Sequence, residues 1–315
     1  MNPVHSATEE KPGLTIAEQL NFLLTNRLPR RWLTLFMGWF SRIDSPALTR
    51  VAIAIWQLFS EDLRLQDART SRFRSLQECF TRQLKPGLRP VDTRPDVVSS
   101  PCDAIVGACG RIQGHQLFQA KGFPYSLGEL IPEPALAARY RNGWFVTLRL
   151  KSSMYHRFHA PVDCRVRRVN YVSGDTWNVN PIALKKVEKL FCKNERAVLD
   201  LEFGQPDHSL TLVPVAAILV ASMKFHFLPE PLNLKYRGPN LIPCDAKLKK
   251  GDEMGYFQHG STILVFASEQ YHLYPGISEG HFVKTGEALL KGHPHPGNRQ
   301  RSATVSQQPT ETLDV

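Results

Sequence analysis

Short apolar segments separated by Gly and Pro dominate the sequence after Ser100, and this pattern limits the folds open to the chain. Residues 144–150 and 197–203 show partial alternation of apolar and polar side chains, which is typical of half-buried strands. Similar segments are residues 165–172, 211–223 and 261–267, with one helix expected at 182–191. Because regular helices do not separate the strands, we predict an α+β protein in which an N-terminal helical region precedes a mainly antiparallel β sandwich or barrel-like domain.

The N-terminal region, residues 14–60, has helical periodicity instead. Its central segment repeats large apolar side chains every three or four residues, with arginines at both ends. These side chains are Trp32, Leu35, Phe36, Trp39 and Phe40. Ser45 is a candidate N-cap for the next helix, and Pro46 suits that helix's first position. The apolar stripe expected on this helix is Leu48, Val51, Ala52, Ile55, Trp56 and Phe59.

Two interpretations of these helices remain open. In one, their apolar stripe packs on the following domain as a helical cap. In the other, they lie in a membrane interface, with aromatic side chains among the lipids and arginines at the headgroups. A few large apolar side chains at about 1.5–3 kcal/mol each make the second interpretation energetically reasonable.

The composition is that of a globular protein large enough to bury a sizeable core: 315 residues, 42% hydrophobic and 22% charged. Its net charge of +10 indicates an anionic partner, either nucleic acid or acidic lipid. The basic side chains of residues 61–100 offer phosphate contacts or form a solvated face. They are Arg72, Arg74, Arg82, Lys85, Arg89 and Arg94. Aromatic residues for base stacking are sparse among them, so we expect no nucleic-acid partner.

The six cysteines are scattered without a C-x-x-C pair, which favours reduced thiols over disulfides or a zinc site. The N-terminus lacks an apolar signal core, and no segment approaches the roughly 20 apolar residues of a membrane span. The nearest, residues 210–223, is interrupted by Pro214 and fits buried strands better. The predicted divisions are a disordered segment (1–13), a helical membrane-associating region (14–60), a basic connector (61–100), a β-rich catalytic domain (101–292) and a disordered tail (293–315).

A Gly260-Ser261-Thr262 step stands at the start of the apolar run 263–266. The second glycine of a G-x-S-x-G nucleophile elbow is missing, which leaves an α/β-hydrolase unsupported. The sequence also lacks a G-x-x-x-x-G-K-[ST] phosphate loop and an H-E-x-x-H zinc pair. By itself the step fits an ordinary turn. Ser261 becomes a candidate nucleophile only if a base and an acid lie nearby in the fold.

Two other segments offer those partners. Asp103 lies in Ser99-Ser100-Pro101-Cys102-Asp103-Ala104, and His156 and His159 lie in Tyr155-His156-Arg157-Phe158-His159. Triads are assembled in space and not along the sequence, so this separation is no obstacle. A chain of this length nevertheless contains several such trios by chance.

Five motifs taken together are more specific, and they occur in order between about residue 30 and residue 290. They are Ser100-Pro101-x-Asp103, Gln119-Ala120-Lys121-Gly122-x-x-Tyr125-Ser126-Leu127, Tyr155-His156-Arg157-x-His159-x-Pro161, Leu190-Phe191-x-x-Asn194-Glu195-Arg196, and Glu253-Met254-Gly255-x-Phe257-x-x-Gly260-Ser261-Thr262. With these five motifs together, the chain resembles phosphatidylserine decarboxylase proenzymes of the bacterial, membrane-associated type.

The resemblance implies a self-processing enzyme with a pyruvoyl group, and no metal ion is expected at its site. Asp103, His159 and Ser261 match the acid, the base and the serine of the family's motifs. His159, oriented by Asp103, would take the proton of Ser261, which attacks the carbonyl of Gly260. The resulting ester eliminates to a dehydroalanine that becomes the pyruvoyl group. Cleavage then leaves a β chain, residues 1–260, and an α chain, residues 261–315.

The chemical need for this group is clear, because amino-acid side chains offer no electron sink for a decarboxylation. The pyruvoyl carbonyl, made from Ser261, would form a Schiff base with the amine of phosphatidylserine and accept the electrons of the breaking bond. Loss of CO₂ and protonation then give phosphatidylethanolamine. His156 resembles the family's histidine at the substrate carboxylate and is our candidate acid, with a structural hydrogen-bonding role as the alternative.

Several positions depart from the family's usual pattern. Met154 stands where many relatives have Asp, Ala104 and Ala216 replace common glycines, and His259 precedes the Gly-Ser step. None of these changes removes a member of the trio. Asp163 is a rival acid, but it follows the histidine motif, so we prefer Asp103.

We therefore expect a phosphatidylserine decarboxylase, peripheral on the cytoplasmic side of the cell membrane. Its partners would be phosphatidylserine in an anionic bilayer and, within the protein, its own α and β chains, which stay associated; assembly into a homo-oligomer remains open. Two alternatives are a serine hydrolase that keeps its serine and a noncatalytic lipid-binding relative.

Overall fold

The computed structural model describes residues 30–60, 62–118, 124–204, 208–218, 222–258 and 261–292. Several sequence predictions therefore lie outside the described residues. These are the segments 1–13, 14–29 and 293–315, the Gln119–Gly122 part of one motif, and His259 with Gly260.

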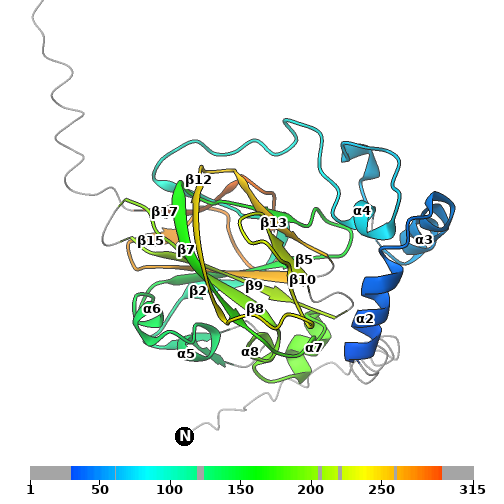
Figure 1. Cartoon of the computed structure of the whole chain (residues 1–315). Helices are drawn as coiled ribbons and strands as arrows, with labels where there is room; N and C mark the ends of the chain where they lie inside the picture. Colours follow the sequence, from blue (N-terminus) through cyan, green and yellow to red (C-terminus); the bar gives the residue numbers. More distant parts are fainter. Residues whose placement is uncertain are drawn as a thin grey trace, which may run out of the picture.

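An eight-stranded sheet forms the centre of the β-rich part (Figure 1), and each neighbouring pair of its strands is antiparallel. In spatial order its strands are β12 (Leu241–Leu248), β7 (Cys164–Val172), β8 (Arg196–Leu201), β9 (Leu210–Ala216), β14 (Ser261–Ala267), β5 (Trp144–Leu150), β2 (Ala104–Arg111) and β16 (Phe282–Val283). The predicted α+β, mainly antiparallel class is confirmed. Strands β5 and β14 have the predicted bounds.

Three smaller antiparallel sheets accompany it. The first contains β11 (Leu232–Asn233), β10 (Ser222–Phe225), β13 (Glu253–Phe257) and β6 (Arg157–His159). The second contains β1 (Val97–Ser99), β17 (Ala288–Gly292) and β15 (Tyr271–Leu273), and the third pairs β3 (Gln116–Phe118) with β4 (Pro124–Ser126). Because β1 pairs with β17, the predicted boundary at residue 100 does not separate two independent units.

Both faces of the eight-stranded sheet are buried. On one face, Val146, Leu148 and Ile263 join a core with side chains of the four-stranded and three-stranded sheets, such as Phe257 and Leu290. On the other face, residues including Phe266 pack against four short helices. These helices are α5 (Leu127–Leu130), α6 (Pro134–Ala138), α7 (Pro181–Lys186) and α8 (Leu190–Lys193). Burial on both faces explains why alternation along the strands was only partial.

Two predicted elements differ from the structure. The helix expected at 182–191 is two short helices, α7 and α8, separated by Lys189 in the left-handed region (φ 53°). The run 211–223 is divided between β9 and β10. Pro214 lies within β9, opposite Ile263 of β14, so the interpretation of this stretch as buried strand and not membrane span is confirmed.

The N-terminal helices stand at one side of the β-rich part (Figure 1): α2 (Arg30–Phe40), α3 (Pro46–Phe59) and α4 (Leu76–Phe80), with a short 3₁₀ turn, η1 (Leu65–Asp67). Ser45 caps α3 as predicted, since its hydroxyl accepts the Leu48 N–H at 3.4 Å. Ile53 of α3 packs with Leu63, Phe73 and Cys79 in a small separate core. None of the described helices is both long and apolar enough to cross a bilayer.

The apolar stripe of α2 and α3 faces outward. Trp32 is 75% exposed, Trp39 63% and Leu58 79%. Other exposed members are Leu35, Phe36, Leu48, Val51 and Ile55. Trp56, which we expected on the same stripe as Leu48, is only partly exposed and packs against the small core. Most of the stripe is therefore exposed and not buried against the following domain, whereas Trp56 of α3 does pack inward.

The basic connector is also only partly a solvated face. Arg72, Arg74, Lys85 and Arg94 are exposed, as expected. Arg82 is buried, however, and donates hydrogen bonds to the carbonyl oxygens of Cys79, Leu63 and Ser153. A buried guanidinium of this kind ties separate backbone segments together.

Two leucines of the sheet, one buried and one exposed, provide a test of this description. Leu264 is fully buried in β14, whereas Leu241 on edge strand β12 is 55% exposed. We expect Leu264→Ala to lower the free energy of unfolding by about 2–5 kcal/mol. The matched Leu241→Ala should change it by about 0.5 kcal/mol or less. Urea denaturation followed by tryptophan fluorescence measures both, and equal losses would contradict the assigned positions.

Candidate active site

Strand β6 brings the histidine motif to the Asp103 segment. The His159 N–H donates to the Pro101 carbonyl at 2.7 Å, two residues before Asp103. On its other side β6 pairs with β13, and the Phe257 N–H donates to the His156 carbonyl at 3.0 Å. The backbone thus places three segments that are far apart in the sequence beside one another.

Ser261 is the first residue of β14 and lies opposite Leu150 of β5 and Ala216 of β9. Directly opposed residues project to the same face of a sheet, and Leu150 and Ala216 belong to the core that includes Phe158 of β6. Ser261 therefore faces the core to which the histidine strand contributes. It is fully buried.

The Ser261 hydroxyl has no hydrogen-bond partner among the described residues. A buried polar group in this state costs about 1–3 kcal/mol, so it needs an explanation. Thr262 shares the property, and the missing partner alone does not single out Ser261. It does fit a hydroxyl kept for a reaction, because residue 261 would lose that hydroxyl when the prosthetic group forms.

His159 is held by both ring nitrogens. Nδ1 lies 2.8 Å from the Gly251 carbonyl oxygen, and Nε2 lies 3.0 Å from the Tyr155 hydroxyl. A carbonyl can only accept, so the neutral ring carries its proton on Nδ1 and leaves Nε2 as the basic nitrogen. Burial lowers the pKa of His159, an effect partly offset by the Gly251 carbonyl and by the nearby charges of Glu253 and Asp103. The ring therefore suits a general base at neutral pH.

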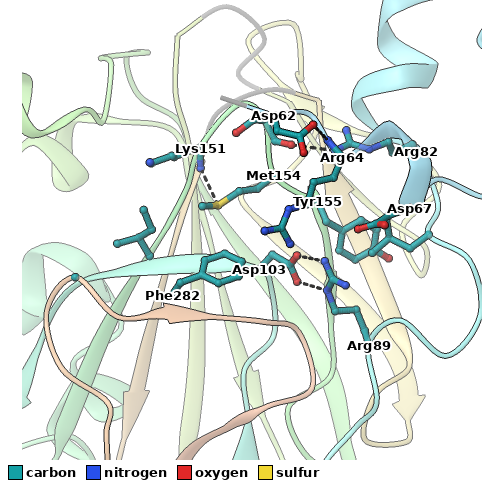
Figure 2. Close-up of a pocket in the computed structure, with 14 residues that line it drawn as sticks. Asp62, Arg64, Asp67, Arg82, Arg89, Asp103, Lys151, Met154, Tyr155 and Phe282 are labelled. Atoms are coloured by element: carbon teal, nitrogen blue, oxygen red, sulfur yellow. Dashed lines mark hydrogen bonds and ion pairs between the residues drawn. The ribbon is translucent and has the colours of Figure 1, made fainter. Parts of the chain in front are cut away.

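The Asp103 carboxylate does not touch His159 in the described contacts, contrary to our expectation. Arg89 binds both of its oxygens, with Nε 2.7 Å from Oδ1 (Figure 2). The N–H and hydroxyl of Thr285 donate to Oδ1 at 2.9 and 3.0 Å. The guanidinium fork matches a carboxylate, so Arg89 competes for the acid. Asp103 still acts on His159 through its charge.

Asp163, the rival acid, lies elsewhere. Its carboxylate binds Lys249 Nζ at 2.9 Å and the Lys250 N–H at 2.8 Å, both near the surface. The hydrogen bond to Lys249 lowers the pKa of Asp163. These contacts agree with the preference for Asp103.

His156 is buried at the end of an aromatic stack that the sequence did not reveal. The Phe80 ring lies 4.0 Å from the imidazole, centroid to centroid, and Trp56 of α3 stacks on Phe80 at 5.8 Å. Nδ1 of His156 lies 2.9 Å from the Met154 carbonyl. The stack connects the helical region to the candidate acid.

A cavity of about 280 Å³ opens beside Asp103 (Figure 2). Tyr155 and Arg89 line it together with Lys151 and Arg64, none of which we singled out from the sequence as site residues. The Met154 sulfur accepts the Lys151 N–H at 3.3 Å. Among the described residues, no cluster of His, Cys, Asp and Glu is arranged to hold a metal ion.

Removing one member of the Arg89–Asp103 pair should be costly, because their side chains are only 14% and 3% exposed. In a Ser261→Ala background, we expect Arg89→Met to lower the free energy of unfolding by about 3 kcal/mol, since Asp103 loses its cation. Arg165→Met breaks a pair whose side chains are 34% and 58% exposed and should cost less than about 1 kcal/mol. Urea denaturation compares the two; similar small losses would mean that the buried pair is not formed.

Comparison with known proteins places the chain in a family. The family model for phosphatidylserine decarboxylase matches residues 76–291. The phosphatidylserine decarboxylase proenzyme of Dickeya dadantii is 32% identical over 87% of this chain and 93% of its own length. The proenzymes of Haemophilus influenzae and a Polaromonas species are 34% and 35% identical, each over 83% of this chain and 92% and 94% of their own lengths. The chain therefore belongs to the phosphatidylserine decarboxylase family.

Proposed function

We propose that this chain is a membrane-associated phosphatidylserine decarboxylase that makes its own pyruvoyl group from Ser261. The observation that carries the proposal is the placement of Ser261: a buried hydroxyl without a described partner, on the core face that the histidine strand shares. Family membership supplies the reaction.

Self-cleavage would begin when Ser261 Oγ attacks the Gly260 carbonyl carbon and His159 Nε2 receives the hydroxyl proton. His159 then returns the proton to the amine that leaves Gly260, which makes an ester. Elimination releases the Gly260 carboxylate and leaves dehydroalanine at residue 261. One water enters and one ammonia leaves as that residue becomes the pyruvoyl group. Asp103 would assist through its charge, because its carboxylate is held by Arg89 and Thr285.

The pyruvoyl carbonyl supplies the electron sink for decarboxylation. Ser261, from which the group would be made, has Leu150 and Ala216 as its strand neighbours. His156 would act as the acid at the substrate carboxylate, kept in place by Phe80 and by its contact with the Met154 carbonyl. The Asp103 cavity carries groups of both signs, which suits a headgroup with an ammonium, a carboxylate and a phosphate.

The two products would remain associated after cleavage. Strand β14 is hydrogen-bonded to β5 and β9 along its whole length, so residues 261–267 stay in the centre of the sheet. Thr285 of the smaller piece also binds Asp103 of the larger. Separation would expose the sheet's interior.

The helical region and the location proposed from the sequence fit this picture, whereas the boundary at residue 100 does not, because β1 pairs with β17. The exposed aromatic side chains of α2 and α3 support a helical membrane-associating region, and the net charge of +10 suits an anionic leaflet. We propose peripheral attachment on the cytoplasmic side of the cell membrane, with the β-rich domain as the catalytic part.

Three proteins test the reaction on vesicles that contain phosphatidylserine. The parent should become two chains and release CO₂ with phosphatidylethanolamine. Ser261→Ala should stay in one piece and be inactive. His156→Ala should cleave normally but lose about 10²–10⁴ in decarboxylation rate, because the positioned acid is gone. A parent chain that stays whole and forms no phosphatidylethanolamine would favour a serine hydrolase or a noncatalytic lipid-binding relative, and would refute the proposed function.

A double variant tests the membrane surface. Trp32→Ser with Trp39→Ser removes two exposed indoles from α2 and should weaken vesicle binding at least about tenfold, since burying each large side chain contributes more than about 1.4 kcal/mol. Leu241→Ser is the control, because Leu241 is exposed on edge strand β12, away from α2. Co-sedimentation with anionic vesicles measures both. Equal binding by the double variant and the parent would rule out this surface.

A further inference from the structure

The bond proposed for self-cleavage follows Gly260, in a short segment, residues 258–261, that is held at both ends. At one end, Gln258 comes directly after β13, and its N–H donates to the Ser222 carbonyl of β10 at 3.2 Å. At the other end, Ser261 is fixed between β5 and β9. Consecutive Cα atoms are about 3.8 Å apart, so two intervening residues leave the chain little freedom of placement. The position of Gln258 therefore restricts where the chain can place the Gly260 carbonyl.

An arginine from the N-terminal helical region reaches this cleavage segment. Arg42 follows α2, and its Nη2 donates to Gln258 Oε1 at 3.3 Å, across 216 positions of the sequence. Its Nε donates to Gln77 Oε1 of α4 at 3.1 Å. The Gln77 N–H in turn donates to the Ser41 carbonyl at 2.8 Å, which holds the backbone beside Arg42 against α4. Arg42 thus connects the helical region to the start of the cleavage segment.

The chemistry of the two side chains fixes the direction of this contact. A guanidinium only donates, so Gln258 presents its amide oxygen to Arg42. Hydrogen bonds to charged groups are stronger than those between neutral groups. Arg42 is exposed, but Gln258 is only 6% exposed, so water has little access to the accepting end. The contact therefore adds a side-chain restraint to the backbone hydrogen bond between Gln258 and Ser222.

We propose that Arg42 and Gln258 are positioning residues for self-cleavage: the guanidinium holds Gln258, and Gln258 sets the place of the Gly260–Ser261 bond. The inference rests on the proposed function. Neither side chain gives or takes a proton in this role, because both act through the backbone of the cleavage segment. It follows that self-cleavage depends on the N-terminal helical region, although the acid, the base and the serine lie outside it.

Self-cleavage of the full chain, pulse-labelled in cell-free translation and sampled on denaturing gels, measures this role. Arg42→Met removes the donor, and Gln258→Leu removes the acceptor. We expect each variant to slow cleavage about tenfold, because a small displacement of a reacting group is costly in rate. Arg50→Met is the matched control and should cleave at the parental rate. Arg50 is an exposed arginine of α3, and its Nε donates to the Pro46 carbonyl of its own helix at 3.3 Å.

A double-variant cycle separates the contact from general structural damage. Arg42→Met combined with Gln258→Leu should be no slower than either single variant, since both changes remove the same hydrogen bond. Gln258→Glu keeps an oxygen that accepts from Arg42 and should cleave at the parental rate, but it should be slow when combined with Arg42→Met. Parental rates in the single variants, or two losses that multiply in the double variant, would overturn the inference.

Hydrogen exchange provides a second measurement that needs no cleavage. In the uncleaved Ser261→Ala chain, Arg42→Met should speed exchange of the Gln258 N–H about tenfold, because the segment opens more easily, whereas Arg50→Met should not. Exchange in β9, inside the eight-stranded sheet, should stay the same, which separates local opening from global unfolding. Equal exchange at Gln258 in all these chains would overturn the inference. A parent chain that never cleaves would refute the proposed function, and the exchange result would still decide whether Arg42 holds this segment.

Discussion

The pairing of β14 on both edges is the constraint on which the site depends. Hydrogen bonds to β5 and β9 fix the strand from its first residue, and that residue is Ser261. The nucleophile's backbone is consequently held in the sheet, its side chain is buried, and its strand neighbours face one apolar core. A nucleophile held in this way avoids the entropy cost of reaching its target carbonyl. Lowering this cost is a large part of what enzymes contribute to such reactions.

The same pairing explains how a protein can be cut beside its own core and remain folded. The bond proposed for cleavage precedes a strand whose partners lie in the other product, so the sheet holds both pieces. Asp103 adds a polar contact between them through Thr285. Asp103 therefore has a structural role in addition to its electrostatic one. This is a physical reason for its carboxylate to be held by Arg89 and not by His159.

Local sequence patterns correctly predicted the elements that depend on apolar runs and helix capping. The apolar runs at 144–150 and 261–267 became β5 and β14 with the same bounds, and Ser45 caps α3. The helix expected at 182–191 was wrong as a single element, because the chain turns at Lys189 through a left-handed conformation that no periodicity announces. The apolar stripe of α2 and α3 left two interpretations open, because periodicity alone does not tell whether a stripe faces a neighbouring element or the outside.

The site was predictable as a set of residues but not as a set of contacts. Arg89 lies 14 residues before Asp103, and Tyr155 is merely the first letter of a histidine motif. Neither position carries a pattern that distinguishes a solvated side chain from a partner in the site. Phe80 and Trp56 illustrate the same limit, since an apolar residue near a helix end gives no hint that it stacks toward His156.

The most direct measurement of the central claim is the intact mass of purified protein. We predict two chains whose summed mass exceeds that of the 35.7 kDa precursor only by one water gained less one ammonia lost, with a hydrazine-reactive ketone at residue 261. A chain that stays whole, or two pieces that together gain a full water and carry no ketone, would contradict the account.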